Sequence, residues 1–396
     1  MNTTIKNHRF YLLFFPLGHM AVDWGGGAIL LLAPAIAIAY DLSALQVGIL
    51  LTSMELGAGI AYAPAGMLGD RIKRRGFLLL LSFWWVAIGF FIASFAPNYW
   101  SLVALITVAI VGVAAWHPVA TGVMVEQMSD RKAQALGIHA IGGTISHVLA
   151  PLSVGFLLIY FDWREVLQIS AIPALVVGVS LIWLRKRIPD SKGEKISKSD
   201  LRNIWEAWRT PLGVITALML GTYQTSFVAL QAMTPLFLVR EHEFSIALTS
   251  VVFAGMLTGG AILSPLIGRA SDTIGRKPVA AAALFGAGIM AIVAAFATSG
   301  LLLVGGLIIS GTLIVCVRSV MLASAVDVTS GRESTALGLA FTIMDGVGAL
   351  GAIAAGAIGT NDLRLAIGFA GFAAIVALVF AFLLPSKSLS LKKSTV

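Results

Sequence analysis

The stretch GMLGDRIKRRG at residues 66–76 decides the fold, because GRASDTIGRK at residues 268–277 repeats it 202 positions later. A long apolar segment precedes each copy and another follows it. The repeat therefore predicts two equivalent halves, each with a short charged turn between two membrane helices. The matched residues are Gly66 with Gly268, Asp70 with Asp272, Arg74 with Arg276, and Arg75 with Lys277.

Composition places the chain among membrane proteins. Of its 396 residues, 58% are hydrophobic and only 12% are charged, and its mean hydropathy is +0.93. A soluble domain carries about 25% charged residues, so this chain has more apolar surface than one soluble core can bury. No Walker motif, GxSxG, HExxH or paired-cysteine metal signature is present, so no enzyme class marked by these motifs is predicted.

Twelve segments are long enough to cross a bilayer, which needs roughly 20 apolar residues. We therefore predict an all-α membrane protein with twelve transmembrane helices in two pseudo-symmetric six-helix bundles. The predicted domains are an N-terminal bundle at 1–185, a cytoplasmic linker at 186–210 and a C-terminal bundle at 211–396. The predicted helices are 10–39, 46–68, 77–96, 100–125, 134–160, 165–185, 211–239, 246–267, 278–298, 300–325, 335–359 and 364–384.

The distribution of basic residues predicts the orientation, because Lys and Arg are retained on the cytoplasmic side. With the N-terminus inside, the linker and most basic loop residues face the cytoplasm, and only Arg164, Arg240 and Arg364 lie outside. We expect a multi-pass protein of the plasma (inner) membrane with both termini in the cytoplasm. Its net charge of +8 is expected to face anionic lipid and not nucleic acid.

The charged turns and the two six-helix halves resemble the major facilitator superfamily over essentially the whole chain. The first turn keeps the family pattern except that Gly69 and Lys73 replace the usual Ala and second Gly. The matching residues are Gly66, Leu68, Asp70, Arg71, Arg74 and Arg75 in the first copy, and Gly268, Asp272, Gly275, Arg276 and Lys277 in the second. The resemblance implies a secondary transporter that works by alternating access.

Within the superfamily, the chain is most similar to the drug:proton antiporters and the fosmidomycin-resistance-like exporters. This resemblance rests on His19 and Asp23 in the first helix and on AWHP at 115–118. It implies proton-coupled efflux of a small molecule, either drug-like or an organic anion. We expect a monomer in the lipid bilayer, with a small-molecule substrate and protons as partners, no nucleic acid and no cofactor.

The charged turns also suggest a gate on the cytoplasmic side. An aspartate at a helix end can cap a neighbouring helix and pair with an arginine, which ties helices together in one conformation. Substrate or proton binding must then supply the free energy that breaks these contacts. The alternative is a plain topogenic turn. The predicted gate residues are Gly66, Asp70, Arg71, Arg74, Gly268, Asp272 and Arg276.

Ionisable residues inside the helices indicate what is transported, because a charge in hydrocarbon is costly and usually functional. Asp23 lies near the middle of the first helix, four residues after His19, so the two share a face. Glu55 lies at a similar depth in the second helix. We predict that Asp23, Glu55 and His19 couple proton movement to transport. The alternative is that each carboxyl only forms a hydrogen bond with a neighbouring helix.

All four intramembrane histidines belong to the N-terminal half: His19, His117, His139 and His147. They fit either a polar pathway for protons and substrate or a transition-metal site. In the metal alternative, the ligands are His19, Asp23, His117 and His147, with Glu55 as a further candidate. No known metal motif has this spacing, so no metal site is predicted firmly.

The C-terminal half contributes Arg318 and Asp345, from consecutive predicted helices. They fit either an intramembrane ion pair or a site in which Arg318 binds an anionic group of the substrate. The predicted substrate cavity also includes an indole, a phenol, an amide and two imidazoles. Its full set is Trp116, His117, His147, Tyr223, Gln224, Arg318 and Asp345.

Two departures from the family pattern leave the direction of transport open. Val108 stands where many proton-driven exporters have an arginine, and Ala150 replaces the glycine before Pro151. Uptake by proton symport and export of a metal or metal chelate remain alternatives, and a receptor or channel is the alternative outside the transporters. The sequence does not identify the substrate.

Overall fold

Helices are the only regular secondary structure among the residues described by the computed structural model, which are 2–128, 132–190, 202, 205–297, 300–328 and 333–385. The helices are α1 (Asn2–Ala39), α2 (Ala44–Arg71), α3 (Arg75–Ala93), α4 (Tyr99–Gln127), α5 (Lys132–Leu157), α6 (Trp163–Ser170), α7 (Ile172–Leu184), η2 (Arg185–Arg187), α9 (Pro211–Arg240), α10 (Ile246–Ile274), α11 (Arg276–Phe296), α12 (Leu301–Cys316), α13 (Arg318–Val328), α14 (Glu333–Val347), α15 (Leu350–Gly359) and α16 (Leu363–Phe382).

Twelve spans among these helices are long and apolar enough to cross a membrane, which confirms the predicted number. Helices are favoured because every backbone N–H and C=O group in lipid must be satisfied within its own segment. Three of the spans contain short breaks that the sequence did not predict. The pairs α6 and α7, α12 and α13, and α14 and α15 each form one interrupted span.

Polar residues at the predicted turns determine where several helices begin. Asn98 caps α4 by accepting a hydrogen bond from the backbone N–H of Ser101 (3.0 Å). Asp162 caps α6, and the side chain of Glu165 accepts a hydrogen bond from the Asp162 N–H in return. Such reciprocal caps satisfy backbone donors at a helix start that have no partner within the helix.

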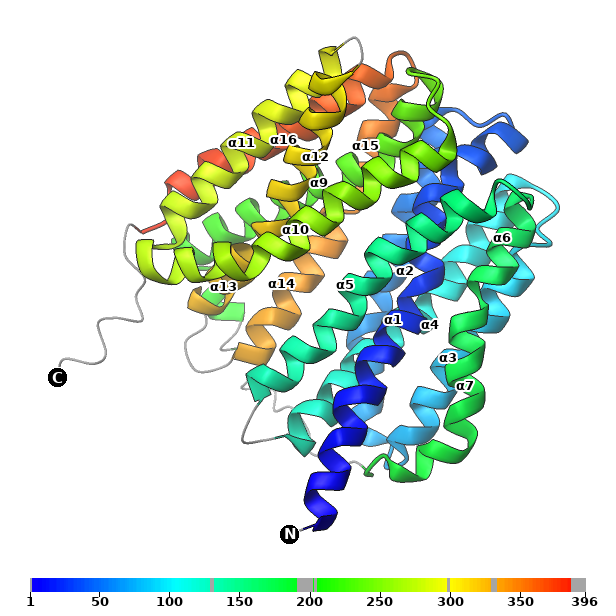
Figure 1. Ribbon diagram of the computed structural model, residues 1–396. Coiled ribbons are helices and arrows are strands. Elements are labelled where there is room, and N and C mark those ends of the chain that lie inside the picture. Colours follow the sequence, from blue (N-terminus) through cyan, green and yellow to red (C-terminus); the bar gives the residue numbers. More distant parts are fainter. Residues whose placement is uncertain are drawn as a thin grey trace. The chain divides into compact units, whose positions relative to one another are not determined.

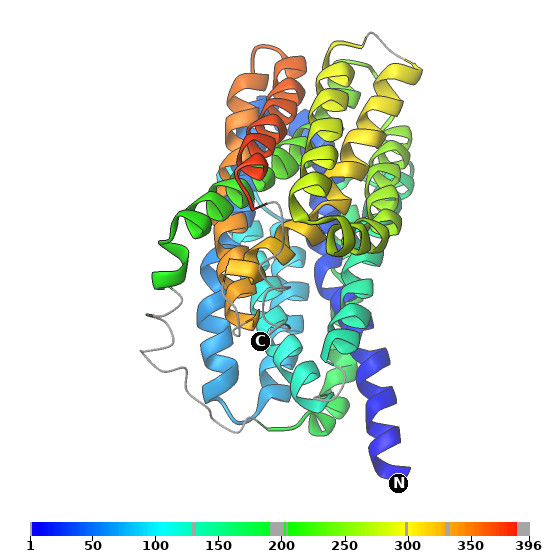
Figure 2. The ribbon, with the colours of Figure 1, turned by 90° about the vertical axis from the view of Figure 1, so that its left-hand side faces the viewer.

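The chain divides into two compact units, and residues 1–40 and 53–195 form the first. In it α1 packs along α5 and also contacts α4, while α3 packs against α4 and α7 (Figure 1). The first turns of α1 extend past the neighbouring helices of this unit (Figure 2). A Cβ atom on Gly142 would lie only 2.0 Å from the carbonyl oxygen of Pro16. The close packing of α1 on α5 therefore requires glycine at this position.

The second unit comprises residues 41–52 and 196–396. Here α16 packs against α9 and α11, and α12 packs against α10 and α11 (Figure 1). The first turns of α2 belong to this unit: the Thr52 hydroxyl donates to the Ala349 carbonyl (2.8 Å) and accepts from the Ile353 N–H (3.0 Å). Thus α2 divides at about Thr52, a division that the predicted domain boundaries did not include.

We predict that Gly142→Ala separates α1 from α5 and destabilises the protein by about 1–3 kcal/mol, the usual cost of overpacking. Thermal unfolding of the purified protein measures the loss. Gly137→Ala is the matched control on the same helix, because a Cβ atom there meets nothing within 4 Å. Equal unfolding temperatures for the two variants would contradict the close contact between Gly142 and Pro16.

Candidate functional site

The carboxylate of Asp23 lies between two imidazoles near the middle of the first span. Its Oδ2 atom is 3.2 Å from Nε2 of His19, one helical turn earlier on α1. Its Oδ1 atom is 3.1 Å from Nε2 of His117 on α4. All three side chains are at least three-quarters buried, with exposed fractions of 13–21%. The structure thus brings together three residues that the sequence placed in one set only in the metal alternative; otherwise His19 and Asp23 were predicted for proton coupling and His117 for the substrate cavity.

The backbone determines which nitrogen of His19 carries a proton. Nδ1 of His19 is 2.9 Å from the carbonyl oxygen of His139. Because a carbonyl oxygen can only accept a hydrogen bond, Nδ1 must be the donor. In the neutral ring, Nε2 is then unprotonated and faces the Asp23 carboxylate. A second proton or another cation is therefore needed to make the contact between Nε2 and Oδ2 favourable.

His139 completes this cluster; the sequence singled it out as an intramembrane histidine but did not place it in the proton-coupling, cavity or metal sets. Its ring stacks on His19, with 4.3 Å between centroids, and on Trp116, with 5.3 Å between centroids. Both ring nitrogens of His139 and Nε1 of Trp116 are buried and form no hydrogen bond with a described residue. Gly143 leaves room for the cluster, because a Cβ atom there would lie 2.6 Å from Nε2 of His19.

The three histidines also offer donors that a metal ion could use. One ligand nitrogen from each of His19, His117 and His139 lies within 4.8 Å of the others. Imidazole with a nearby carboxylate suits transition metals such as zinc, cobalt or nickel. His147 of the predicted alternative set does not belong to this group and is exposed. Glu55, the further candidate ligand, is partly buried on α2.

The first charged turn is held by a residue outside the predicted gate set. Arg75 begins α3, is buried, and forms an ion pair with Glu126 near the end of α4. Its Nε also donates to the Gly69 carbonyl at 3.3 Å. Arg71 and Arg74 are exposed. The side chain of Asp70 lies outside the described part of the chain, so its predicted role remains a prediction.

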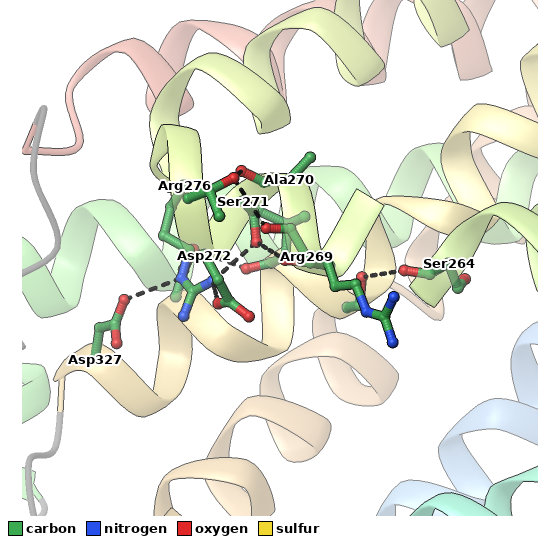
Figure 3. Close-up of polar contacts among 12 residues, drawn as sticks. Ser264, Arg269, Ala270, Ser271, Asp272, Arg276 and Asp327 are labelled. Carbon is green, nitrogen blue, oxygen red and sulfur yellow. Dashed lines mark hydrogen bonds and ion pairs between the residues drawn. The ribbon is translucent and has the colours of Figure 1, made fainter. Parts of the chain in front are cut away.

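The second charged turn is built in a similar way (Figure 3). Arg276 forms ion pairs with Asp272 and, at 3.3 Å, with Asp327 of α13. Its guanidinium also donates to the Ser271 hydroxyl at 2.8 Å. These contacts join α10, α11 and α13 at one end of the second unit. The predicted residues Asp272 and Arg276 thus meet, and Asp327 is an addition that the motif did not reveal.

The two ion pairs correct the register of the repeat. Arg75 and Glu126 are 51 residues apart in sequence, and so are Arg276 and Asp327. Arg75 therefore corresponds to Arg276, one position away from the match with Arg74 that the motifs suggested. The reason is the spacing around the turn: Arg75 follows Asp70 by five positions, whereas Arg276 follows Asp272 by four. In the second copy only Gly275, at φ 109°, separates α10 from α11. The shared 51-residue spacing is a signal that sequence comparison could have found.

The second unit places Arg318 between two aromatic rings. Its guanidinium carbon is 5.7 Å from the ring centroid of Phe227 on α9 and 6.0 Å from that of Phe341 on α14. The Tyr223 hydroxyl, one turn from Phe227, donates to the Ile314 carbonyl at 3.0 Å. Two further predicted cavity residues of this unit meet although they are 121 residues apart: Nε2 of Gln224 donates to Oδ1 of Asp345 at 3.5 Å.

Comparison with known proteins identifies the family. A sequence profile described as Major Facilitator Superfamily matches residues 17–258 and 216–395. The chain belongs to the major facilitator superfamily. It is therefore a multi-pass membrane transporter of small molecules and not an enzyme. This membership confirms the predicted superfamily and the predicted fold.

Relatives agree with this assignment. The uncharacterized MFS-type transporter YfnC of Bacillus subtilis is 24% identical over 95% of this chain and 92% of its own. The probable 4-methylmuconolactone transporter of Cupriavidus pinatubonensis is 26% identical over 62% of this chain and 59% of its own. A probable sugar efflux transporter of Helicobacter pylori is 24% identical over 62% of this chain and 61% of its own.

Solved structures agree on the fold. A bacterial homolog of the human lysosomal transporter Spinster aligns with a TM-score of 0.80 at 19% identity, covering 95% of this chain and 96% of that one. The D323A mutant of the nucleoside transporter NupG aligns with a TM-score of 0.80 at 15% identity. The alignment covers 93% of this chain and 98% of the NupG chain. These similarities concern the fold alone.

We predict that Glu126→Gln destabilises the protein by about 1–3 kcal/mol, because it leaves the buried Arg75 guanidinium without its counter-ion. Thermal unfolding measures the loss, and the reciprocal exchange Arg75→Glu with Glu126→Arg should recover part of it. Glu206→Gln, which removes the exposed partner of Arg202, serves as the control and should cause no measurable change. Equal behaviour of Glu126→Gln and Glu206→Gln would show that the first ion pair does not stabilise the turn.

Proposed function

We propose that this secondary transporter exports a small molecule, either drug-like or an organic anion, in exchange for protons. The observation that carries the proposal is the Asp23 carboxylate between His19 and His117 in the middle of a membrane span. Intramembrane carboxylates and histidines of this kind commonly form proton relays in transporters. We assign the coupling proton to this cluster.

The position of the proton follows from the tautomer of His19. Nδ1 of His19 donates to the His139 carbonyl, so the transported proton binds between Nε2 and Oδ2 of Asp23. His117 lies on the other carboxylate oxygen and can share the same proton through Asp23. Because these groups interact at hydrogen-bonding distance, they bind and release protons as one unit. Loss of the proton leaves a carboxylate beside a neutral imidazole, which favours rebinding of a proton or a structural change.

Two observations support export as the direction. The first helix and AWHP at 115–118 resemble the fosmidomycin-resistance-like exporters. The sugar transporters among the relatives are named efflux transporters. Uptake by proton symport is the alternative, and the direction of proton flow relative to substrate separates the two.

The two charged turns are proposed to act as a cytoplasmic gate. In each, an arginine at a helix start is paired with an acidic residue 51 positions later. Opening this end of either bundle requires these pairs to separate, and substrate or proton binding supplies the free energy. Placement of both turns and both termini in the cytoplasm follows from the positive-inside rule and belongs to this proposal.

A metal or metal-chelate exporter is the second candidate, and the grouping of His19, His117 and His139 favours it. The discriminating measurement is equilibrium binding of Co²⁺ to protein from which any affinity tag has been removed. Binding that disappears in His139→Phe but persists in His147→Ala would favour a metal ion as cargo. Proton coupling without Co²⁺ binding would favour the first candidate.

We predict that Asp23→Asn abolishes coupled proton movement, because an amide cannot take up the proton shared with His19. Purified protein is reconstituted into liposomes that contain a pH-sensitive dye. Candidate ligands are first selected from sugars, dyes and organic acids by their ability to raise the unfolding temperature. Addition of a selected ligand should then change the internal pH for the native protein and not for Asp23→Asn.

The control variant is Asp362→Asn, which changes an acidic residue outside the spans that caps α16. It should retain ligand-driven pH changes. Full coupled transport by Asp23→Asn would remove this carboxylate from the proton pathway. Ligand transport by the native protein without any pH change would contradict proton coupling itself.

A further inference from the structure

Arg318 is a charged side chain in the second unit with no counter-ion among the residues that the structure describes. It lies at the break between α12 and α13, within the span Leu301–Val328. Charged groups within a membrane almost always face a cavity or a partner, since their burial in hydrocarbon is costly. Arg318 is half-buried and forms no ion pair with any residue in the described ranges, Asp345 included. Of the two interpretations from the sequence, binding of an external anion is therefore favoured.

The aromatic rings of Phe227 and Phe341 hold this guanidinium in place. The distances of 5.7 and 6.0 Å from its central carbon to the two ring centroids are within the range of cation–π attraction. These rings come from α9 and α14, so three separate spans meet at the guanidinium. The phenyl rings, together with a hydrogen bond to the Tyr223 side chain, restrict Arg318 without neutralising its charge. The arginine is therefore arranged in advance for a ligand.

The donor geometry of Arg318 indicates the chemical group that it binds. A guanidinium presents planar N–H donors that match the two oxygens of a carboxylate, and such paired hydrogen bonds are strong. The adjacent phenyl rings offer apolar faces on which an aromatic ring can stack. A flat molecule with a carboxylate at one end satisfies both features, whereas a hydrated inorganic anion satisfies only the first.

The neighbouring residues limit the ligand to a single negative charge. Asp345 is buried on α14, one turn after Phe341, and contacts the Gln224 amide. A second negative charge on the ligand would be repelled by this carboxylate. Oε1 of Gln224 is buried and forms no hydrogen bond with a described residue, so a donor group on the ligand could bind there.

We propose that Arg318, Phe227 and Phe341 bind the carboxylate end of a monoanionic aromatic acid. The proposal rests on the proposed function, because it names the substrate class of the same transporter. It adds Phe227 and Phe341 as residues that determine specificity. The second unit then recognises the substrate, while the first unit carries the proton.

Binding of benzoate to the purified full-length protein tests the proposal. We expect benzoate to raise the unfolding temperature in a saturable manner. Benzamide, which lacks the charge, and phosphate, which lacks the ring, should not do so. Cyclohexanecarboxylate should bind more weakly than benzoate because it cannot stack, and the dianion phthalate should bind more weakly because of Asp345.

Substitutions at Arg318 and Phe341 test whether these residues bind benzoate. Arg318→Lys keeps the charge but loses the planar donors, so benzoate should bind about tenfold more weakly. Phe341→Leu should reduce the preference for benzoate over cyclohexanecarboxylate while leaving some affinity for both. Arg269→Gln removes an exposed arginine of the same unit and is the matched control, with unchanged benzoate binding.

Three results would overturn the proposal: absence of benzoate binding to the native protein, equal binding by Arg318→Lys, or equal stabilisation by benzoate and phosphate. Displacement of benzoate by phosphatidylglycerol would instead assign Arg318 to a lipid headgroup and also overturn it. These binding experiments are independent of the proposed proton exchange, because benzoate binding requires no proton gradient. Benzoate binding that depends on Arg318, without coupled pH changes, would retain this site and reject proton exchange.

Discussion

The carboxylate of Asp23, held between the imidazoles of His19 and His117, is the interaction on which the first unit depends. A carboxylate in the middle of a membrane span is tolerated only with partners, and these come from its own helix and from α4. The third contact, from Nδ1 of His19 to the His139 carbonyl, requires α5 to lie very close to α1. Gly142 and Gly143 permit that approach. Backbone packing and the proposed proton site in this unit are therefore linked.

The two halves resemble each other at their charged turns and differ within their spans. Arg75 and Glu126 correspond to Arg276 and Asp327, with the same spacing. In contrast, the intramembrane cluster of carboxylate and histidines belongs to the first unit, and Arg318 with its aromatic neighbours belongs to the second. The duplicated fold thus has similar ends, and its two unequal interiors are where we propose that the proton and the substrate bind.

Much of the fold could be predicted because the membrane imposes a minimum apolar length on each span. The shared face of His19 and Asp23 was also predictable, since it follows from a four-residue separation on one helix. The approach of His117 and His139 could not be predicted, because it depends on how α1, α4 and α5 pack. Likewise, Phe227 and Phe341 gave no signal in a chain rich in apolar residues. The predicted match of Arg74 with Arg276 was wrong by one residue, because the helix-starting arginine follows the aspartate by five positions in the first copy and by four in the second.

The central claim is that the transported proton binds at Nε2 of His19 against Asp23. Nuclear magnetic resonance of protein labelled with ¹⁵N-histidine tests it directly, with His19→Gln used to assign the signal. We predict that Nδ1 of His19 stays protonated throughout a pH titration, while Nε2 gains and loses a proton in a transition that Asp23→Asn displaces. A His19 ring with its neutral-state proton on Nε2, or a titration that is unchanged in Asp23→Asn, would contradict the account.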